Sequence, residues 1–309
     1  MNKTFDVVVI GAGPAGYIAA IRASQHGKSV ACIDEWKNRD GKNAFGGTCL
    51  NAGCIPSKAL LESSELFYRA KHEFGNHGIK TEKLEFDLSE MQKRRSSIVQ
   101  QLTGGVSGLL KFNKVECLVG HGKLLAEKRV EFTSVSGKSE IIEAANVILA
   151  PGSSPIEIPI ANFDHKNIVD SWDALEFDDV PKRLGIIGAG VIGLELGSVW
   201  SRLGSDVIIL EAKDEFLSIA DKDISKVASK EFKKQGLQIQ LGSNVTNTKL
   251  TKNGVEVTFD HKKKQQSIIV DKLIVAVGRK PFTNNLLSDD SGIHLDERGF
   301  IIVDDKCHT

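Results

Sequence analysis

The chain has 309 residues, of which 41% are hydrophobic and 26% are charged, so it can bury a sizeable core and bulk disorder is excluded. Lysine plus arginine and aspartate plus glutamate number 40 each, and this zero net charge argues against a dedicated binder of nucleic acid or of anionic membranes. At roughly 150 residues per domain, the length predicts two domains.

The first predicted elements are a strand, a glycine loop, a helix and a second strand. Residues 5–10 are apolar and rich in β-branched side chains, the glycine loop 11–16 follows, and residues 17–26 predict an Ala-rich helix. A second strand over 29–33 ends in two acidic residues. This order predicts an α/β fold that begins as a doubly wound sheet.

The next segment carries a cysteine pair. A polar loop leads into residues 46–58, and helices are predicted from there to about residue 74 and again over 89–110, where three glycines form a weak point. The strands expected after these helices lie at 116–119, 129–134, 140–144 and 147–152.

The opening pattern then returns. Residues 153–182 contain three prolines and little periodicity, which indicates a crossing into another domain. The elements predicted after it are a strand at 184–187, a glycine loop at 188–193, a helix to about 203, a strand at 207–210 and an apolar strand at 273–278. In both copies an acid follows the first glycine by 23 residues, so we expect two dinucleotide-binding units.

Each glycine of such a loop has its own physical role. The first permits a tight turn, the second lets a pyrophosphate approach the backbone, and the third lets helix and strand pack closely. The helix N-terminus offers free N–H groups to the phosphate, and the acid accepts hydrogen bonds from ribose hydroxyls. The candidates are Gly11, Gly13, Gly16 and Asp34 in the first unit, and Gly188, Gly190, Gly193 and Glu211 in the second.

The acids also indicate which nucleotide each unit takes. Glu211 would repel a 2′-phosphate and should outweigh the nearby Lys213, so we predict NAD(H) rather than NADP(H). In the first unit Asp34 is better placed than its neighbour Glu35, but the sequence leaves open which of the two contacts the ribose.

Cys49 and Cys54 are separated by four residues, among glycines that permit an irregular backbone. Pro56 and Ser57 predict that a helix starts there, which would favour a thiolate at Cys54, and Lys58 adds positive charge.

The cysteine pair has three possible interpretations: a redox disulfide, two inert buried thiols, or half of a zinc site. Zinc needs four ligands, and Cys32, Cys117 and Cys307 lie in two strands and at the chain end, so no metal is expected. A redox disulfide explains the spacing better. Together with two dinucleotide units, it implies an electron relay between a nicotinamide, a flavin and a disulfide.

The segment 46–61, GGTCLNAGCIPSKALL, strongly resembles the redox motif of dihydrolipoamide dehydrogenases, members of the pyridine nucleotide–disulfide oxidoreductase family. Glutathione and mercuric reductases share the cysteine spacing, but the residues of the motif, together with Glu211, are most similar to those of the lipoamide enzymes. The resemblance extends from Phe5 to Thr309.

The resemblance implies two Rossmann-like domains, the NAD domain being inserted in the FAD domain. The expected boundaries are 1–152 for the FAD domain with its redox disulfide, 153–280 for the NAD domain, and 281–309 for an incomplete return to the FAD domain. A dimerisation domain would be absent.

The resemblance also assigns roles to single residues. Cys49 matches the thiol that exchanges with substrate, Cys54 the thiol next to the flavin, and Glu195 the partner of Lys58 near the flavin. Gly122 matches a backbone position at the FAD adenine, while Val245 and Gly278 match positions that line the NAD site.

The implied reaction is ping-pong oxidation of dihydrolipoamide by NAD through FAD. The implied partners are a lipoyl domain of a 2-oxoacid dehydrogenase complex and, in the complete protein, a second copy. The chain departs from the family at Pro151, where a threonine is usual, and it ends before the Gly-Asp pair that binds FAD and before the domain whose His–Glu pair serves as base. None of its eight histidines is a good substitute, so we expect weak FAD binding and little turnover from these 309 residues alone.

The remaining features fit a protein of the cytoplasm. The sequence shows no signal peptide and no run of about 18 apolar residues, and an odd cysteine count argues against a secreted disulfide scaffold. The lysine run 262–264 predicts a solvated hairpin tip. A related reductase with another substrate and a non-catalytic nucleotide-binding fragment remain as alternatives.

Overall fold

The computed structural model describes residues 3–309 and divides the chain into two compact units. Unit 1 comprises the residues up to Ile55 together with 97–154 and 280–309, and unit 2 comprises 56–96 and 155–279. Unit 2 therefore includes residues 56–96, which lie inside the predicted segment 1–152. The reason is burial, because Leu60 and its apolar neighbours pack into the core of unit 2.

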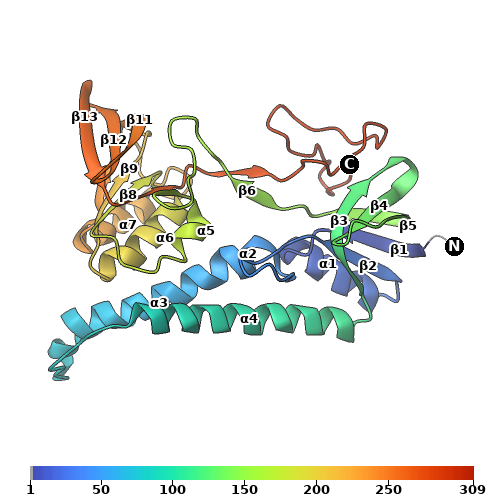
Figure 1. Ribbon diagram of the computed structural model, residues 1–309, viewed down its shortest axis with the longest axis horizontal. Coiled ribbons are helices and arrows are strands. Elements are labelled where there is room, and N and C mark those ends of the chain that lie inside the picture. The colour runs from blue at the N-terminus through green and yellow to red at the C-terminus, as the bar shows by residue number, and fades with distance from the viewer. Residues whose placement is uncertain (1–2) are drawn as a thin grey trace. The chain divides into compact units, whose positions relative to one another are not determined.

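Unit 1 is built on five strands whose pairings close into a ring (Figure 1). Strands β3, β2, β1 and β5 pair in parallel in that order, and β4 pairs antiparallel with β3 and β5. The elements of unit 1 are β1 (Lys3–Ile10), α1 (Pro14–Gln25), β2 (Val30–Asp34), α2 (Gly47–Ala52), β3 (Glu116–Leu124), β4 (Arg129–Ser134) and β5 (Ser139–Leu149).

Strand β5 corrects the expectation of two separate strands at 140–144 and 147–152. It is one strand, because its first residues pair with β4 while the stretch from Ile142 to Leu149 pairs with β1. For the same reason β3 extends to Leu124, where it still pairs with β4.

Unit 2 contains a parallel sheet in the order β10-β9-β8-β14-β7 and a separate antiparallel sheet of β11, β12 and β13 (Figure 1). Its elements are β7 (Ile168–Val169), α5 (Ser171–Ala174), β8 (Arg183–Ile187), α6 (Val191–Arg202), β9 (Asp206–Leu210), α7 (Lys222–Lys234), β10 (Gln238–Gln240), β11 (Ser243–Thr251), β12 (Gly254–His261), β13 (Lys264–Val270) and β14 (Lys272–Val275). The hairpin tip that was predicted at the lysine run 262–264 is confirmed. Lys262 and Lys263 have left-handed φ angles and form the turn between β12 and β13.

Four elements lie where the chain passes between the units. Helices α3 (Cys54–His72) and α4 (Leu88–Phe112) lead out of and back into unit 1, and β6 (Ser153–Pro155) pairs with β15 (Arg279–Pro281). The predicted helix over 89–110 is confirmed, and α4 runs without interruption through the glycines that were expected to be its weak point. Val99, Thr103, Val106 and Leu110 form a buried stripe at helical spacing, and this burial outweighs the low helix propensity of glycine.

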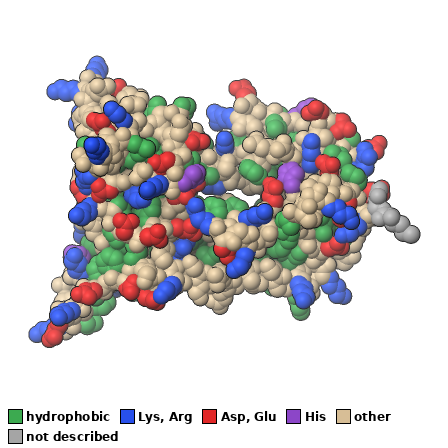
Figure 2. Space-filling model, in the orientation of Figure 1, with side chains coloured by type: hydrophobic (Ala, Val, Ile, Leu, Met, Phe, Trp, Pro, Cys, Tyr) green, Lys and Arg blue, Asp and Glu red, His purple; other side chains and the backbone are tan. Residues whose placement is uncertain are grey.

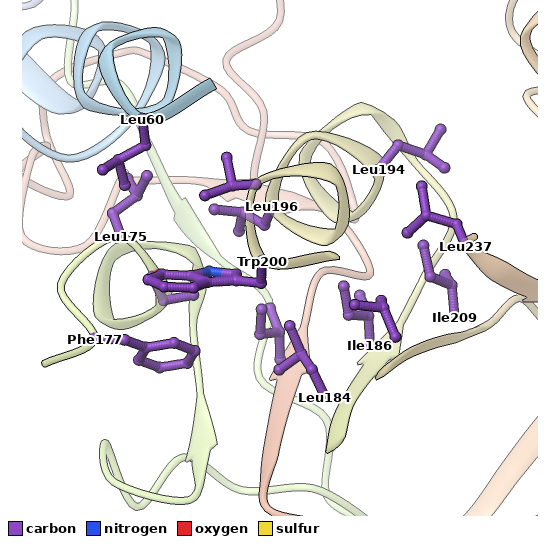
Figure 3. Packing of buried hydrophobic residues seen from close by; sticks show 14 of the residues in the cluster. Leu60, Leu175, Phe177, Leu184, Ile186, Leu194, Leu196, Trp200, Ile209 and Leu237 are labelled. Atoms are coloured by element: carbon purple, nitrogen blue, oxygen red, sulfur yellow. The ribbon is translucent and has the colours of Figure 1, made fainter. Parts of the chain in front are cut away.

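The largest core cluster fills unit 2 between α6 and the parallel sheet (Figure 3). Trp200 on α6 is fully buried, and its indole N–H donates to the Ala174 carbonyl at 3.1 Å. Leu60 of α3 points into the same cluster, beside Leu175 and Leu196. This contact anchors α3 to α6.

Charged side chains of both signs are interspersed over the face shown in Figure 2, in keeping with the balanced composition. Within residues 3–309, no helix has the length and apolar character that crossing a bilayer requires.

Candidate active site

The first glycine loop has the geometry that its sequence predicts. Gly11 has a left-handed φ of 100°, and its N–H donates to the Ile33 carbonyl at 2.8 Å. A Cβ on Gly16 would lie 1.7 Å from the Gly11 carbonyl oxygen, so only glycine lets α1 approach the loop this closely. Gly13 is the N-cap of α1.

The second loop repeats these features. Gly188 has φ 104° and donates to the Leu210 carbonyl at 2.8 Å, and a Cβ on Gly193 would lie 2.2 Å from the Gly188 oxygen. Gly190 is the N-cap of α6, and the position of its missing Cβ has no heavy atom within 4 Å. This open space suits the approach of a pyrophosphate to the backbone.

The acids at the ends of β2 and β9 are held in the same way. Asp34 accepts from the backbone N–H of Ala12 at 2.5 Å and of Trp36 at 2.7 Å. Glu211 accepts from Ala189 at 2.8 Å and from Lys213 at 2.9 Å, the corresponding positions of the second unit. Each carboxylate is thus fixed beside its glycine loop.

The surroundings of the Asp34 carboxyl act on its pKa in two directions. Burial raises the pKa, and the hydrogen bonds from Ala12 and Trp36 oppose that effect, with a net increase over the usual value.

Glu35 lies in a different environment. It is 3.1 Å from Nδ1 of His121, and the other ring nitrogen of His121 is 3.0 Å from the Asn285 carbonyl. Glu35 therefore ties β2 to β3 and to the returning segment, while Asp34 is the acid that contacts the glycine loop.

The start of the cysteine segment packs directly on the first glycine loop. A Cβ on Gly47 would lie 2.6 Å from Cα of Gly13, and the Gly46 N–H donates to the Ala12 carbonyl at 2.9 Å. Both glycines have left-handed φ angles, 119° for Gly46 and 59° for Gly47. From the sequence these glycines were expected only to permit an irregular backbone, although two adjacent glycines are also a sign of close backbone approach.

Gly47→Ala should destabilise unit 1 by about 2 kcal/mol or more, because the left-handed φ and the contact with Gly13 both oppose a side chain. Gly41→Ala is the matched control: its φ is 76°, but nothing lies within 4 Å, so we expect a cost of only about 1 kcal/mol. Urea unfolding of the two variants measures the difference. Equal losses would show that the Gly13 contact is unimportant.

The two cysteines lie in unit 1 but on different helices. Cys49 is half-buried on α2, and Cys54 is exposed as the first residue of α3. Helix α3 thus begins two residues earlier than Pro56, which places Cys54 at the positive end of a 19-residue helix. Between the cysteines, Asn51 is buried and its side-chain amide donates to the Gly47 carbonyl at 3.0 Å.

Cys32 and Cys117 lie opposite each other on β2 and β3. Burial raises the pKa of both thiols, so neither is suited to act as a thiolate nucleophile. Among residues 3–309 no group of three or more His, Cys, Asp or Glu side chains is arranged to hold a metal ion.

Lys58 on α3 and Glu195 on α6 form an ion pair within unit 2, as expected. The Lys58 ammonium is 2.6 Å and 2.9 Å from the two carboxylate oxygens. Ser57 donates to the same carboxylate at 3.2 Å, a contact that the sequence analysis missed.

The remaining candidates lie in packed positions. Gly122 is buried, and a Cβ there would lie 3.2 Å from Ile33, so its absence lets β3 approach β2. The Val245 side chain lies in the core around β12, which leaves its backbone for any contact with a ligand. Gly278 has φ 129°, and its carbonyl accepts from the Ile156 N–H at 3.1 Å.

The sequence was compared with known protein families. The profile of the family described as Pyridine nucleotide-disulphide oxidoreductase matches residues 5–309. The chain belongs to this family.

Its curated relatives include dihydrolipoyl dehydrogenases. The chain is 50% identical to the enzyme of Cupriavidus necator over 312 aligned residues, which cover 100% of the chain and 66% of that protein. It is 40% identical to the mitochondrial enzyme of Pisum sativum, covering 98% of the chain and 60% of that protein. The chain therefore spans less than two thirds of the length of these relatives.

A solved structure gives the same family. The Cu(II) complex of the HOCl-induced flavoprotein disulfide reductase RclA from Escherichia coli superposes with a TM-score of 0.81 at 27% identity, covering 100% of this chain and 64% of that one. The α/β fold with two Rossmann-like units is thereby confirmed.

Members of this pyridine nucleotide–disulfide oxidoreductase family use FAD and NAD, and the two loops fit such cofactors. Each loop joins a strand to a helix of twelve residues whose N-terminus provides free N–H groups. Asp34 and Glu211 each accept a backbone N–H of their loop, where an acid would meet the ribose of a bound dinucleotide.

Proposed function

We propose that this chain is the nucleotide-binding and dithiol part of a dihydrolipoyl dehydrogenase, whose whole length oxidises dihydrolipoamide by NAD through FAD and a redox dithiol. The main support is that two glycine loops of matched geometry occur in one chain with the Cys49–Cys54 segment packed on the first of them. The 50% identity to a dihydrolipoyl dehydrogenase, against 27% to RclA, favours this activity over that of another disulfide reductase.

The two units take different roles in this proposal. Unit 1, together with Lys58, would bind FAD, and unit 2 would bind NAD. The FAD contacts would come from Gly11, Gly13, Gly16, Asp34, Lys58 and Gly122, and the NAD contacts from Gly188, Gly190, Gly193, Glu211, Val245 and Gly278.

The cysteines perform the exchange with substrate. One thiolate of dihydrolipoamide attacks the Cys49 sulfur, the Cys49–Cys54 bond breaks, and Cys54 leaves as a thiolate. The second substrate thiolate then displaces Cys49, which releases oxidised lipoamide and leaves both cysteines reduced. Bound FAD would supply the two-electron link from this dithiol to NAD. The Lys58–Glu195 pair fixes a positive charge four residues after Cys54.

The wider setting rests on the family resemblance. We propose that dihydrolipoamide is presented on a lipoyl domain of a 2-oxoacid dehydrogenase complex, that the whole protein acts as a homodimer, and that it works in the cytoplasm. Neither nucleic acid nor a membrane is a proposed partner.

The decisive test is an anaerobic single-turnover experiment with the purified chain and excess FAD. Dihydrolipoamide should bleach the flavin absorbance and, with NAD present, produce NADH. Glutathione should do neither. Bleaching by glutathione instead would favour another disulfide reductase. Flavin retention without any bleaching by dithiols would favour a nucleotide-binding protein without turnover.

Glu211 should set the choice of nicotinamide cofactor. We expect NADH to bind at least about tenfold more tightly than NADPH, because the carboxylate repels a 2′-phosphate. Glu211→Ala should remove most of this preference, since Lys213 two residues later can then attract the phosphate. Titration of nucleotide fluorescence measures both affinities. Equal affinity of the unmodified chain for NADH and NADPH would contradict the assignment.

A further inference from the structure

Helix α6 carries only two charged side chains, Glu195 and Arg202, and both are paired with α3. Glu195 meets Lys58 at 2.6 Å, and the Arg202 guanidinium meets Glu65 at 2.6 Å. All four residues belong to unit 2. The two charges on each helix are seven positions apart, which is about two turns, so each pair of charges shares one face.

The two ion pairs define one register. The partners are 137 positions apart in both pairs, so α3 and α6 run in the same direction without a relative shift between the pairs. The pairs are about 10 Å apart along the helices, at about 1.5 Å per residue.

The order of charges makes this register specific. Helix α3 has the cation first and the anion second, while α6 has the anion first. A shift of two turns would bring Lys58 against Arg202 in one direction and Glu65 against Glu195 in the other. In the second direction a shift of four residues, about one turn, would already bring Glu62 against Glu195 and Arg69 against Arg202, so like charges would meet at both positions. The apolar contact through Leu60 is non-directional, so it contributes stability without selecting one register (Figure 3).

Arg202 is the more buried member of its pair. Its side chain is 11% exposed, against 47% for Glu65, and its Nη1 also donates to the Leu61 carbonyl at 3.5 Å. Arg202 therefore contacts both a side chain and the backbone of α3.

We propose that Glu65 and Arg202 are positioning residues, which hold α3 in register on α6 and thereby keep Lys58 on Glu195. The inference rests on the proposed function only in giving Lys58 a role beside the flavin. The register itself is a property of α3 and α6.

The test is the rate at which Lys58 is acetylated by a soluble amine reagent, measured by peptide mass spectrometry on the intact chain. Lys58 is 59% exposed, so the reagent can reach it. Glu195→Gln removes the direct partner and sets the upper limit of the rate. Glu65→Gln and Arg202→Gln should each raise the rate about threefold, because they remove the contact that holds α3 on α6 two turns beyond Lys58.

Three further variants separate positioning from general destabilisation. Arg202→Lys keeps the charge and should stay near the unmodified rate. The double variant with Glu65→Gln and Arg202→Gln should match the single variants, since both act through one contact. Glu73→Gln breaks the Arg69–Glu73 pair at the C-terminal end of α3 and should leave the rate unchanged.

An unchanged Lys58 rate in Glu65→Gln would overturn the inference, and this substitution at a half-exposed residue should not unfold the chain. An equal increase in Glu73→Gln would also overturn it, because the effect would then be general loosening of α3. The labelling requires no cofactor. Loss of lipoamide chemistry with the labelling pattern intact would thus count against the proposed function alone.

Discussion

Cys49→Ser should lower dihydrolipoamide-dependent formation of NADH by at least about a thousandfold. The hydroxyl that replaces the thiol cannot form a mixed disulfide with the substrate, and removal of a covalent nucleophile elsewhere costs about 10⁶ in kcat. The structure places Cys49 half-buried on α2, which packs on the first glycine loop through Gly47. NADH absorbance after mixing with excess dihydrolipoamide measures the effect, in single turnover if steady-state rates are low.

Cys117→Ser is the matched control for this experiment. Cys117 lies on β3 in the same unit, and burial raises the pKa of its thiol, so we expect NADH formation within about twofold of the unmodified chain. Full activity of Cys49→Ser would refute the dithiol mechanism. Equal loss in Cys117→Ser would show that the chain is sensitive to any lost thiol.

The second glycine loop allows folding and nucleotide binding to be separated. Gly193→Ala should destabilise unit 2 by about 3 kcal/mol or more, because its Cβ would lie 2.2 Å from the Gly188 carbonyl oxygen and backbone cannot yield cheaply. Gly190→Ala should change stability by about 0.5 kcal/mol at most, since φ is −74° and the space is open.

NADH affinity should respond to both substitutions but for different reasons. In Gly190→Ala the fold persists while the new methyl group fills the space for the pyrophosphate, so we expect about tenfold weaker NADH binding. In a Trp36→Phe background, tryptophan fluorescence during urea unfolding reports on unit 2, which holds the other two tryptophans, Trp172 and Trp200. A Gly190→Ala variant that binds NADH normally would remove the basis for placing NAD at this loop.

Features that depend on nearby residues could be predicted from the sequence. The glycine spacing and the acid 23 residues later predict both loops, because a left-handed turn and a strand-to-helix close approach leave few choices of residue. The spacing of Cys49 and Cys54 predicts a redox pair because the two thiols are only five positions apart in the chain. These constraints act within one strand–turn–helix segment.

Features that depend on distant segments needed the tertiary structure. The sequence left open which of Asp34 and Glu35 contacts a ribose. The structure adds that Asp34 accepts from Ala12 of the glycine loop while Glu35 meets His121, which favours Asp34. The sequence predicted two strands in place of β5. The pairing with β1 that makes β5 continuous joins residues more than a hundred positions apart in the sequence.

The helix register is the clearest case of tertiary control. Lys58 and Glu195 could be matched only through family resemblance, and the Glu65–Arg202 pair was not foreseen. The burial of Leu60 brings α3 onto α6 and assigns residues 56–96 to unit 2. By itself the sequence determined the two glycine loops and the close spacing of Cys49 and Cys54, since their geometry is local. Only the tertiary structure decided which helices hold Lys58 in place, because burial and charge pairing act between segments far apart in the chain.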